Sequence, residues 1–202
     1  MNALFERELG LSVVGLDRFS DVPEVVEDGE TFEANAIKKA ETVSRALNRP
    51  VVADDSGLVV PFLNGAPGVR SARYAGPGAS DRENNEKLLA ALEGATGKER
   101  EAAFVCVLAL KIPGEEPRLV RGECRGRIAF APKGDHGFGY DPLFFLPEYG
   151  KTMGEISPEL KNRISHRAKA FQQLLKLLKE LYSFEGNASP KGGGENENSH
   201  RQ

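Results

Sequence analysis

The sequence predicts an α/β domain in which helices lie on both sides of a mixed β-sheet. Two observations carry this prediction: apolar residues recur at helical spacing in several segments, and near-continuous apolar runs lie between those segments. With 202 residues, of which 40% are hydrophobic, the chain is long enough to bury one sizeable core. Its net charge of -3 argues against a nucleic-acid polymer or an anionic membrane as the partner.

The first half of the chain is expected to form a strand at Leu11–Leu16 and a helix at Thr31–Leu47. The helix prediction rests on one apolar stripe, which consists of Phe32, Ala36, Ile37, Ala40, Val43 and Leu47. A β-branched run then starts at Val51, which predicts a buried strand that ends at Asp54-Asp55 and a Ser-Gly turn. A capping box, Ser80-Asp81-Arg82-Glu83, opens a helix that is expected to run to about Leu92.

The second half is expected to supply the central strand, because Ala102–Leu110 is almost entirely apolar. Leu119–Phe130 is a more polar strand, in which Gly122 and Gly126 are expected to form bulges. A helical stripe from Ile164 to Leu181 closes a single domain that is predicted to span residues 1–184. Residues 185–202 are poor in apolar side chains and are expected to be a disordered tail.

Asp54 and Asp55 are the most informative acidic residues. Neighbouring strand residues point to opposite faces of a sheet, so one carboxylate can hold the turn while the other faces a metal ion or a water molecule. The alternative is an Asx turn that caps the strand. An acidic loop that contains Glu27 is either a solvated loop or a second source of oxygen ligands, and two carboxylates from separate segments would suit magnesium bound to a nucleotide.

Two further segments combine side chains that suit a nucleotide. Gly134–Pro142 alternates glycines with Phe138 and Tyr140, so backbone can approach a ligand closely and a ring can stack on a base. Lys161–Arg167 places basic groups at the start of the last helix, where the helix dipole disfavours cations and a bound anion would offset the mismatch. A tight turn with an aromatic anchor and an ordinary basic surface are the alternatives.

In combination these motifs resemble the inosine triphosphate pyrophosphatase family. The resemblance covers roughly Leu11–Leu181 and rests on several motifs in a fixed order. They are Glu27-Asp28-Gly29-Glu30-Thr31-Phe32, Asn35-Ala36, Lys39-Ala40, Ala53-Asp54-Asp55-Ser56-Gly57-Leu58, Gly65-Ala66-Pro67-Gly68-Val69, Ser71-Ala72-Arg73-Tyr74, Gly137-Phe138-Gly139-Tyr140-Asp141-Pro142 and Ser165-His166-Arg167.

The resemblance implies an elongated mixed sheet with two lobes around a central substrate cleft, usually in a homodimer. It also implies hydrolysis of noncanonical purine nucleoside triphosphates (ITP, dITP and XTP) to the monophosphate and pyrophosphate, with Mg²⁺. Asp55 would be the catalytic general base and would bind the metal together with Glu27. The residues expected to bind substrate are Ser56, Lys39, Phe138, Gly139, Tyr140, Asp141, Lys161, His166 and Arg167. Among these, Lys39 and Lys161 would contact the triphosphate, and His166 with Arg167 would meet the purine 6-oxygen.

The start of the chain departs from the family pattern. Members of the family begin with a strand and a Thr/Ser-x-Asn-x-x-Lys loop, whereas Met1–Leu9 looks like part of the helix after that loop. We therefore expect either a start codon placed too far downstream or a shortened variant, and a chain that folds poorly or binds substrate weakly.

Two other functions stay open on the sequence alone. The first is a nucleotide-binding pseudoenzyme, which the missing loop favours. The second is a domain with a phospho-acceptor Asp, which does not account for Phe138–Asp141 or Ser165–Arg167. Two cysteines without metal-ligand spacing, and no signal peptide or membrane-spanning run, predict a cytoplasmic protein.

Overall fold

The computed structural model describes residues 2–186, which divide into two compact units. The smaller unit comprises Met1–Val13 and Leu175–Gln202. In its described part, helix α1 (Asn2–Leu9) and the last turns of helix α5 (His166–Gly186) are joined by Lys179, whose Nζ donates to the Glu8 carboxylate at 2.7 Å. The helix at the start of the chain is confirmed, and all but the first two residues of the expected tail 185–202 lie outside the described part.

The larger unit, Val14–Leu174, contains a five-stranded sheet with the order β1-β2-β3-β4-β5. The strands are β1 (Val51–Val59), β2 (Glu101–Lys111), β3 (Arg118–Ile128), β4 (Phe144–Leu146) and β5 (Lys151–Thr152). The α/β class is confirmed. Every strand pairing in residues 2–186 is antiparallel, which differs from the expected mixed sheet. The short connection between β2 and β3 is one reason, because parallel neighbours need a long crossover.

The helices of this unit begin where the sequence predicts. Helix α2 (Phe32–Leu47) follows Thr31, whose hydroxyl accepts a hydrogen bond from the Ala34 N–H at 3.1 Å. Helix α3 (Asp81–Ala91) follows Ser80, and both hydrogen bonds of the predicted capping box are present. The unit also contains the 3₁₀ turns η1 (Leu16–Arg18), η2 (Pro61–Leu63), η3 (Gly68–Arg73) and η4 (Gly97–Arg100).

The expected last helix is divided at Ser165. Helix α4 (Pro158–Ile164) ends there, and the Ser165 hydroxyl accepts from the Ala168 N–H at 3.2 Å, which caps the start of α5. Lys161 therefore lies on α4, whereas His166 and Arg167 lie in the first turn of α5.

Two strand predictions are wrong: one strand ends later than expected, and the other does not form. β1 does not end at its two acids, because Ser56 and Gly57 stay in register opposite Cys106 and Val105. Gly57 makes this possible, since a Cβ there would lie 2.5 Å from the Gly68 carbonyl oxygen. The expected strand at Leu11–Leu16 is not formed: residues 11–15 have no regular structure, and the side chains of Val14 and Leu16 are about half exposed.

The two glycines of β3 do not form bulges, because β3 pairs with β2 residue by residue from Arg118 to Arg127. They allow close packing instead. A Cβ at Gly122 would collide with the backbone of α5 at Ala170, and one at Gly126 would meet the Phe144 ring.

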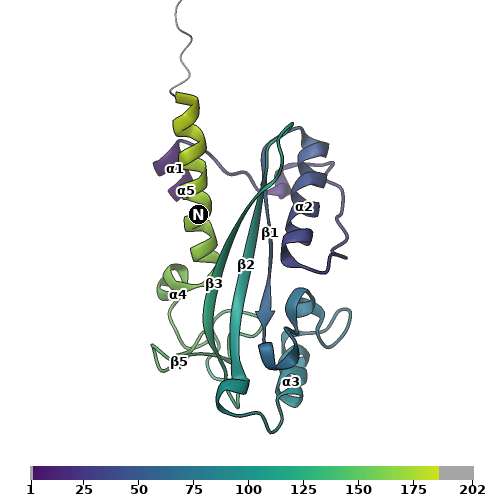
Figure 1. The fold of residues 1–202 in the computed structure, drawn as a ribbon, viewed down its shortest axis with the longest axis vertical. Coiled ribbons are helices and arrows are strands. Elements are labelled where there is room, and N and C mark those ends of the chain that lie inside the picture. Colours follow the sequence, from purple (N-terminus) through teal and green to yellow (C-terminus); the bar gives the residue numbers. More distant parts are fainter. Residues whose placement is uncertain (1, 187–202) are drawn as a thin grey trace, which may run out of the picture. The chain divides into compact units, whose positions relative to one another are not determined.

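Two core clusters of the larger unit use alternate residues of β2. One cluster packs α2 against β2 and contains Phe32, Ala36, Ala40, Val105, Val107 and Ala109. The other joins α3 to β2 and β4 and includes Leu58, Leu88, Leu92, Phe104, Phe144 and Met153. β1 is an edge strand of the sheet and α2 lies alongside it (Figure 1), so the acids of β1 lie next to the helix that carries Lys39.

Candidate active site

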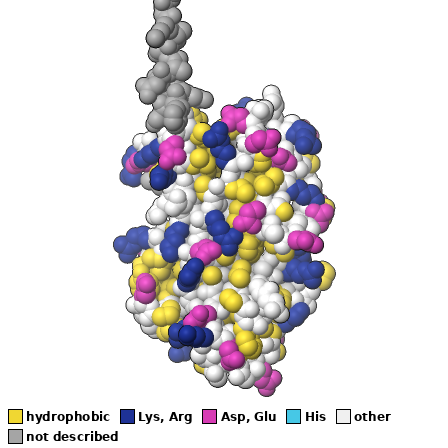
Figure 2. Space-filling model, in the orientation of Figure 1, with side chains coloured by type: hydrophobic (Ala, Val, Ile, Leu, Met, Phe, Trp, Pro, Cys, Tyr) yellow, Lys and Arg dark blue, Asp and Glu magenta, His cyan; other side chains and the backbone are white. Residues whose placement is uncertain are grey.

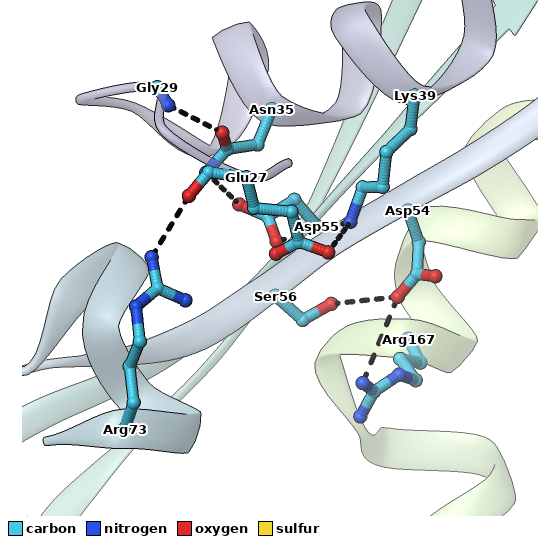
Figure 3. Close-up of polar contacts among 9 residues, drawn as sticks. All are labelled: Glu27, Gly29, Asn35, Lys39, Asp54, Asp55, Ser56, Arg73 and Arg167. Carbon is cyan, nitrogen blue, oxygen red and sulfur yellow. Dashed lines mark hydrogen bonds and ion pairs between the residues drawn. The ribbon is translucent and has the colours of Figure 1, made fainter. Parts of the chain in front are cut away.

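Asp55 lies on β1 and faces α2. Its side chain is only 9% exposed. The Asn35 amide Nδ2 donates to the carboxylate Oδ2 at 3.1 Å, and the Lys39 Nζ lies 3.4 Å from Oδ1. Asn35 and Lys39 are four residues apart and therefore share one face of α2. The helix thus holds both oxygens of the Asp55 carboxylate (Figure 3).

The acidic loop before α2 completes this group. The Lys39 Nζ also donates to Glu27 Oε1 at 3.0 Å, and the Arg73 guanidinium donates to the Glu27 carbonyl oxygen at 3.0 Å. The fully buried Asn35 accepts from the Gly29 N–H at 2.8 Å through its Oδ1. A cavity of about 750 Å³ adjoins the loop, and Glu27 and Arg73 are among its lining residues. Asn35 and Lys39 therefore tie the loop to Asp55.

The surroundings of the Asp55 carboxylate have the electrostatic character that suits a proton acceptor. Burial raises the pKa of its carboxyl above the usual range, and the negative charge of Glu27 acts in the same direction. The Asn35 hydrogen bond and the Lys39 charge lower the pKa without cancelling the effect of burial. A carboxylate with a raised pKa is a stronger base, which is the property that general-base catalysis needs.

Glu27 and Asp55 fit a Mg²⁺ site in which water and phosphate oxygens supply the remaining ligands. Their Oε1 and Oδ1 atoms lie 3.0 and 3.4 Å from the same Lys39 nitrogen, so the two carboxylates converge on one cationic group. Within residues 2–186, no three or more His, Cys, Asp or Glu side chains form a group that could hold a metal. Mg²⁺ commonly takes one or two protein carboxylates and completes its octahedron with water and phosphate oxygens. The pair therefore suits a metal that arrives with a phosphorylated ligand.

Asp54 faces the opposite side of β1, as strand alternation predicts. Its carboxylate accepts from the Ser56 hydroxyl at 3.3 Å and lies 3.8 Å from the Arg167 guanidinium. The Asp54 side chain is 51% exposed. Figure 3 shows Asp55 directed toward Asn35 and Lys39, and Asp54 directed toward Arg167. Of the two acids, only Asp55 is buried beside a lysine.

The segment 134–142, which precedes β4, presents one aromatic ring to solvent. The Phe138 ring is 62% exposed, and the Lys161 Nζ and the Arg167 guanidinium lie 4.9 and 5.4 Å from its centroid. The Asp141 carboxylate accepts from the Phe138 N–H at 2.9 Å and pairs with Lys161. Tyr140 is instead buried in the core, and its hydroxyl donates to the Ser71 carbonyl at 2.8 Å. Of the two predicted rings, Phe138 is therefore the one that a flat ligand can reach.

His166 is buried beneath this segment and stacks on Phe104, with ring centroids 4.9 Å apart. Burial lowers the pKa of its imidazole to about 3, and the positive charges of Arg167 and Lys161 act in the same direction. The ring is therefore neutral at physiological pH. Among the described residues its buried Nδ1 has no hydrogen-bond partner, whereas its Nε2 lies 3.4 Å from the Arg167 guanidinium.

Apart from Tyr140, which lies in the core, the predicted site residues form two groups on either side of β1. Glu27, Lys39 and Asp55 make the first group, and the second consists of Ser56, Phe138, Gly139, Asp141, Lys161, His166 and Arg167. Two contacting residues, Asn35 and Arg73, had no predicted role. The signal for Asn35 is a polar side chain beside the apolar stripe of α2, whereas nothing local marks Arg73.

Comparison with known proteins gives consistent results. The sequence profile of the Ham1 family matches residues 1–177. The chain is 53% identical over 184 residues to a Geobacillus kaustophilus protein named dITP/XTP pyrophosphatase. The alignment covers 91% of this chain and 90% of the relative. It is 50% identical over 169 residues to a Bacillus subtilis protein of the same name, at 84% and 85% coverage.

Solved structures agree with the sequence comparison. The Staphylococcus aureus Ham1 protein superposes with a TM-score of 0.83 at 44% identity, covering 89% of this chain and 93% of that one. A Mycobacterium abscessus nucleoside-triphosphatase, also described as a dITP/XTP pyrophosphatase, gives a TM-score of 0.75 at 40% identity, with 87% and 91% covered. By profile, sequence and fold, this chain belongs to the Ham1 family.

Proposed function

We propose that this protein hydrolyses the noncanonical purine nucleoside triphosphates dITP, ITP and XTP to the monophosphate and pyrophosphate. The observation that carries the proposal is the buried Asp55 carboxylate, held between Asn35 and Lys39 with its pKa raised. The names of the Geobacillus and Bacillus relatives point to the same substrates.

The two groups of side chains suit the two ends of a nucleotide. Lys39 offers a positive charge beside Asp55 for the phosphates, and Lys161 offers a second one beside Phe138. The exposed Phe138 ring suits stacking on a purine. Because β1 is an edge strand, a ligand can cross it and contact both groups. We place the phosphates at Lys39 and the base against Phe138, with Ser56 and Asp141 at its rim.

Asp55 acts as the general base in this proposal. Its ionised carboxylate takes a proton from a water molecule as the water oxygen bonds to the α-phosphorus. The bond from the α-phosphorus to the bridging oxygen breaks, and pyrophosphate leaves with that oxygen. Lys39 offsets the charge on the phosphates. Magnesium held by Glu27, Asp55 and phosphate oxygens would supply further charge neutralisation.

Arg167 explains a preference for purines with a 6-oxygen. A guanidinium carries only donors, so it can bond a 6-oxo group but not the 6-amino group of adenine. A donor that the bound base covers and leaves without a partner costs about 1–3 kcal/mol, which disfavours ATP. The neutral His166 lies beside it, with its Nε2 3.4 Å from the Arg167 guanidinium, and can accept a hydrogen bond that orients this donor toward the base.

We further propose that the enzyme works in the cytoplasm as a homodimer and takes small nucleotides, not nucleic acid or membranes. Basic and acidic side chains are interspersed on the face in Figure 2, which supports a small-molecule substrate. Among the described residues, no helix is long and apolar enough to cross a membrane. Light scattering on the purified protein tests the dimer.

The test of the function is a substrate panel of ITP, dITP, XTP, GTP and ATP, with pyrophosphate and orthophosphate assayed separately. We expect one pyrophosphate per monophosphate, no orthophosphate, faster turnover of ITP and XTP than of ATP, and loss of activity with EDTA. Tight ITP binding without pyrophosphate release would instead establish the pseudoenzyme. That alternative has no support from a site in which Asp55, Lys39 and Glu27 are all in place.

A further inference from the structure

Helix α3 holds the backbone of Gly139 from both sides. The Asp81 Oδ2 accepts from the Gly139 N–H at 2.6 Å, and the Asn85 Nδ2 donates to the Gly139 carbonyl oxygen at 2.9 Å. Asp81 and Asn85 are one helical turn apart and therefore lie on the same face of α3. Both polar backbone groups of a single loop residue are thus bonded to side chains more than fifty positions away in sequence.

Helix α3 is itself held in place at its start and by packing in the core. Its start is closed by the capping box at Ser80, and Leu88 on the same helix is fully buried in the core. The loop that contains Gly139 is not part of a strand or helix, and Gly139 itself has φ = 61°, which few residues other than glycine adopt readily. Local backbone preferences therefore leave the loop with several alternatives, and the contact with α3 selects one of them.

Among the described residues, the bond to Gly139 is the hydrogen bond that orients the Asn85 side-chain amide. Its Oδ1 is buried and makes no hydrogen bond with the described residues, while its Nδ2 bonds to Gly139. A buried acceptor without a partner is costly, so the amide is kept in place at the expense of stability. Such costs are commonly found where a side chain serves a functional site.

We propose that Asp81 and Asn85 are positioning residues that fix the Phe138 ring in the orientation that receives the purine base. Phe138 directly precedes Gly139, and its ring lies beside Lys161 and Arg167. Fixing both polar groups of Gly139 restricts rotation of the adjoining peptide and thereby the direction of the Phe138 side chain. This inference rests on the proposed function, since it concerns how the same site recognises the base.

The test uses the full chain with Asn85→Ala, Asp81→Ala and Asp81→Asn. Asp81→Asn keeps an acceptor for the Gly139 N–H and serves as the conservative rescue. Arg82→Ala is the matched control, because Arg82 lies on the same turn of α3 and, among residues 2–186, its side chain forms an exposed ion pair with Glu86 and no bond to Gly139. Hydrogen–deuterium exchange of the segment 137–141 is measured without nucleotide, and KM and kcat are measured with ITP.

For the two alanine variants we expect amide exchange in the segment 137–141 to be about tenfold faster, the effect of losing one hydrogen bond. We expect KM for ITP to rise about five- to tenfold with kcat within about twofold, since the base is held less well while Asp55 is untouched. Asp81→Asn and Arg82→Ala should stay within about twofold of the wild type in both readouts.

Unchanged exchange in Asn85→Ala would overturn the contact itself. Faster exchange with unchanged KM, or a loss confined to kcat, would overturn the positioning role. A lower thermal midpoint with a proportional loss of active protein, at unchanged KM, would make both residues merely structural. If the wild-type protein hydrolyses none of the panel nucleotides, the proposed function fails, whereas the exchange measurement still decides whether α3 holds the loop.

Discussion

Replacing Asp55 with asparagine separates its role as a base from its role in packing. Asparagine has the same shape and keeps one oxygen that can accept from the Asn35 amide, so the fold around β1 is retained. It has no basic oxygen to take a proton from water. Loss of a general base lowers kcat by about 10²–10⁴-fold. This corresponds to about 3–5 kcal/mol in the activation barrier.

Asp54→Asn is the matched control, because it makes the same change one residue earlier on the same strand. The Asp54 side chain is 51% exposed, against 9% for Asp55, and faces Arg167 instead of Lys39. We expect Asp54→Asn to alter KM for ITP through Arg167 and to leave kcat within about fivefold. Pyrophosphate release at saturating ITP and Mg²⁺ gives both values, and thermal midpoints verify folding. The reasoning is refuted if Asp55→Asn keeps kcat within threefold of wild type, or if both variants lose kcat equally.

Three further predictions follow from the charges around the site. Arg167→Ala should reduce the ITP-to-ATP ratio of kcat/KM by about tenfold, since it removes the donor that distinguishes a 6-oxo from a 6-amino group; equal losses for both nucleotides would place Arg167 at the phosphates. In the metal-free protein, Glu27→Gln should lower the pKa of Asp55, because it removes a negative charge that raises it; ¹³C NMR of the Asp55 carboxyl checks the direction, and a rise would contradict it. Because the pKa of His166 is lowered to about 3 in the folded protein, the unfolded chain binds a proton that the folded protein does not bind between about pH 6.5 and 3. Its contribution to stability is thus complete above pH 6.5 and decreases as the pH falls, by up to about 1.4 kcal/mol per pH unit. Urea unfolding from pH 7 to 4 should show a smaller decrease for His166→Gln, and identical slopes would contradict a buried neutral imidazole.

Local sequence was sufficient wherever neighbouring residues decide the structure. The start of α2 at Thr31, the capping box of α3 and the apolar strand β2 are set by side chains within a few positions of one another. The alternation of Asp54 and Asp55 is equally local, because it follows from the pleat of any strand. The ordered motifs also indicated the family that the profile confirms.

Tertiary contacts decided the features that the sequence predicted wrongly. β1 runs past its acids because β2 supplies a partner for Ser56 and Gly57, and no local signal shows that partner. The glycines of β3 were predicted to form bulges. Instead, their lack of a side chain allows α5 and β4 to approach β3 closely. The run at Leu11–Leu16 has strand-like residues, yet its side chains are largely exposed, so burial does not stabilise a strand there.

The sequence by itself indicated most of the residue types that the candidate site brings together, because motifs record the residue types that a reaction needs. Only the tertiary structure decided how they are oriented and what supports them. It placed Asn35 and Lys39 on the two oxygens of Asp55, buried Tyr140 while leaving Phe138 exposed, and brought α3 to Gly139. The physical reason is that burial, pKa shifts and long-range hydrogen bonds depend on residues far apart in sequence, which meet only when the chain folds.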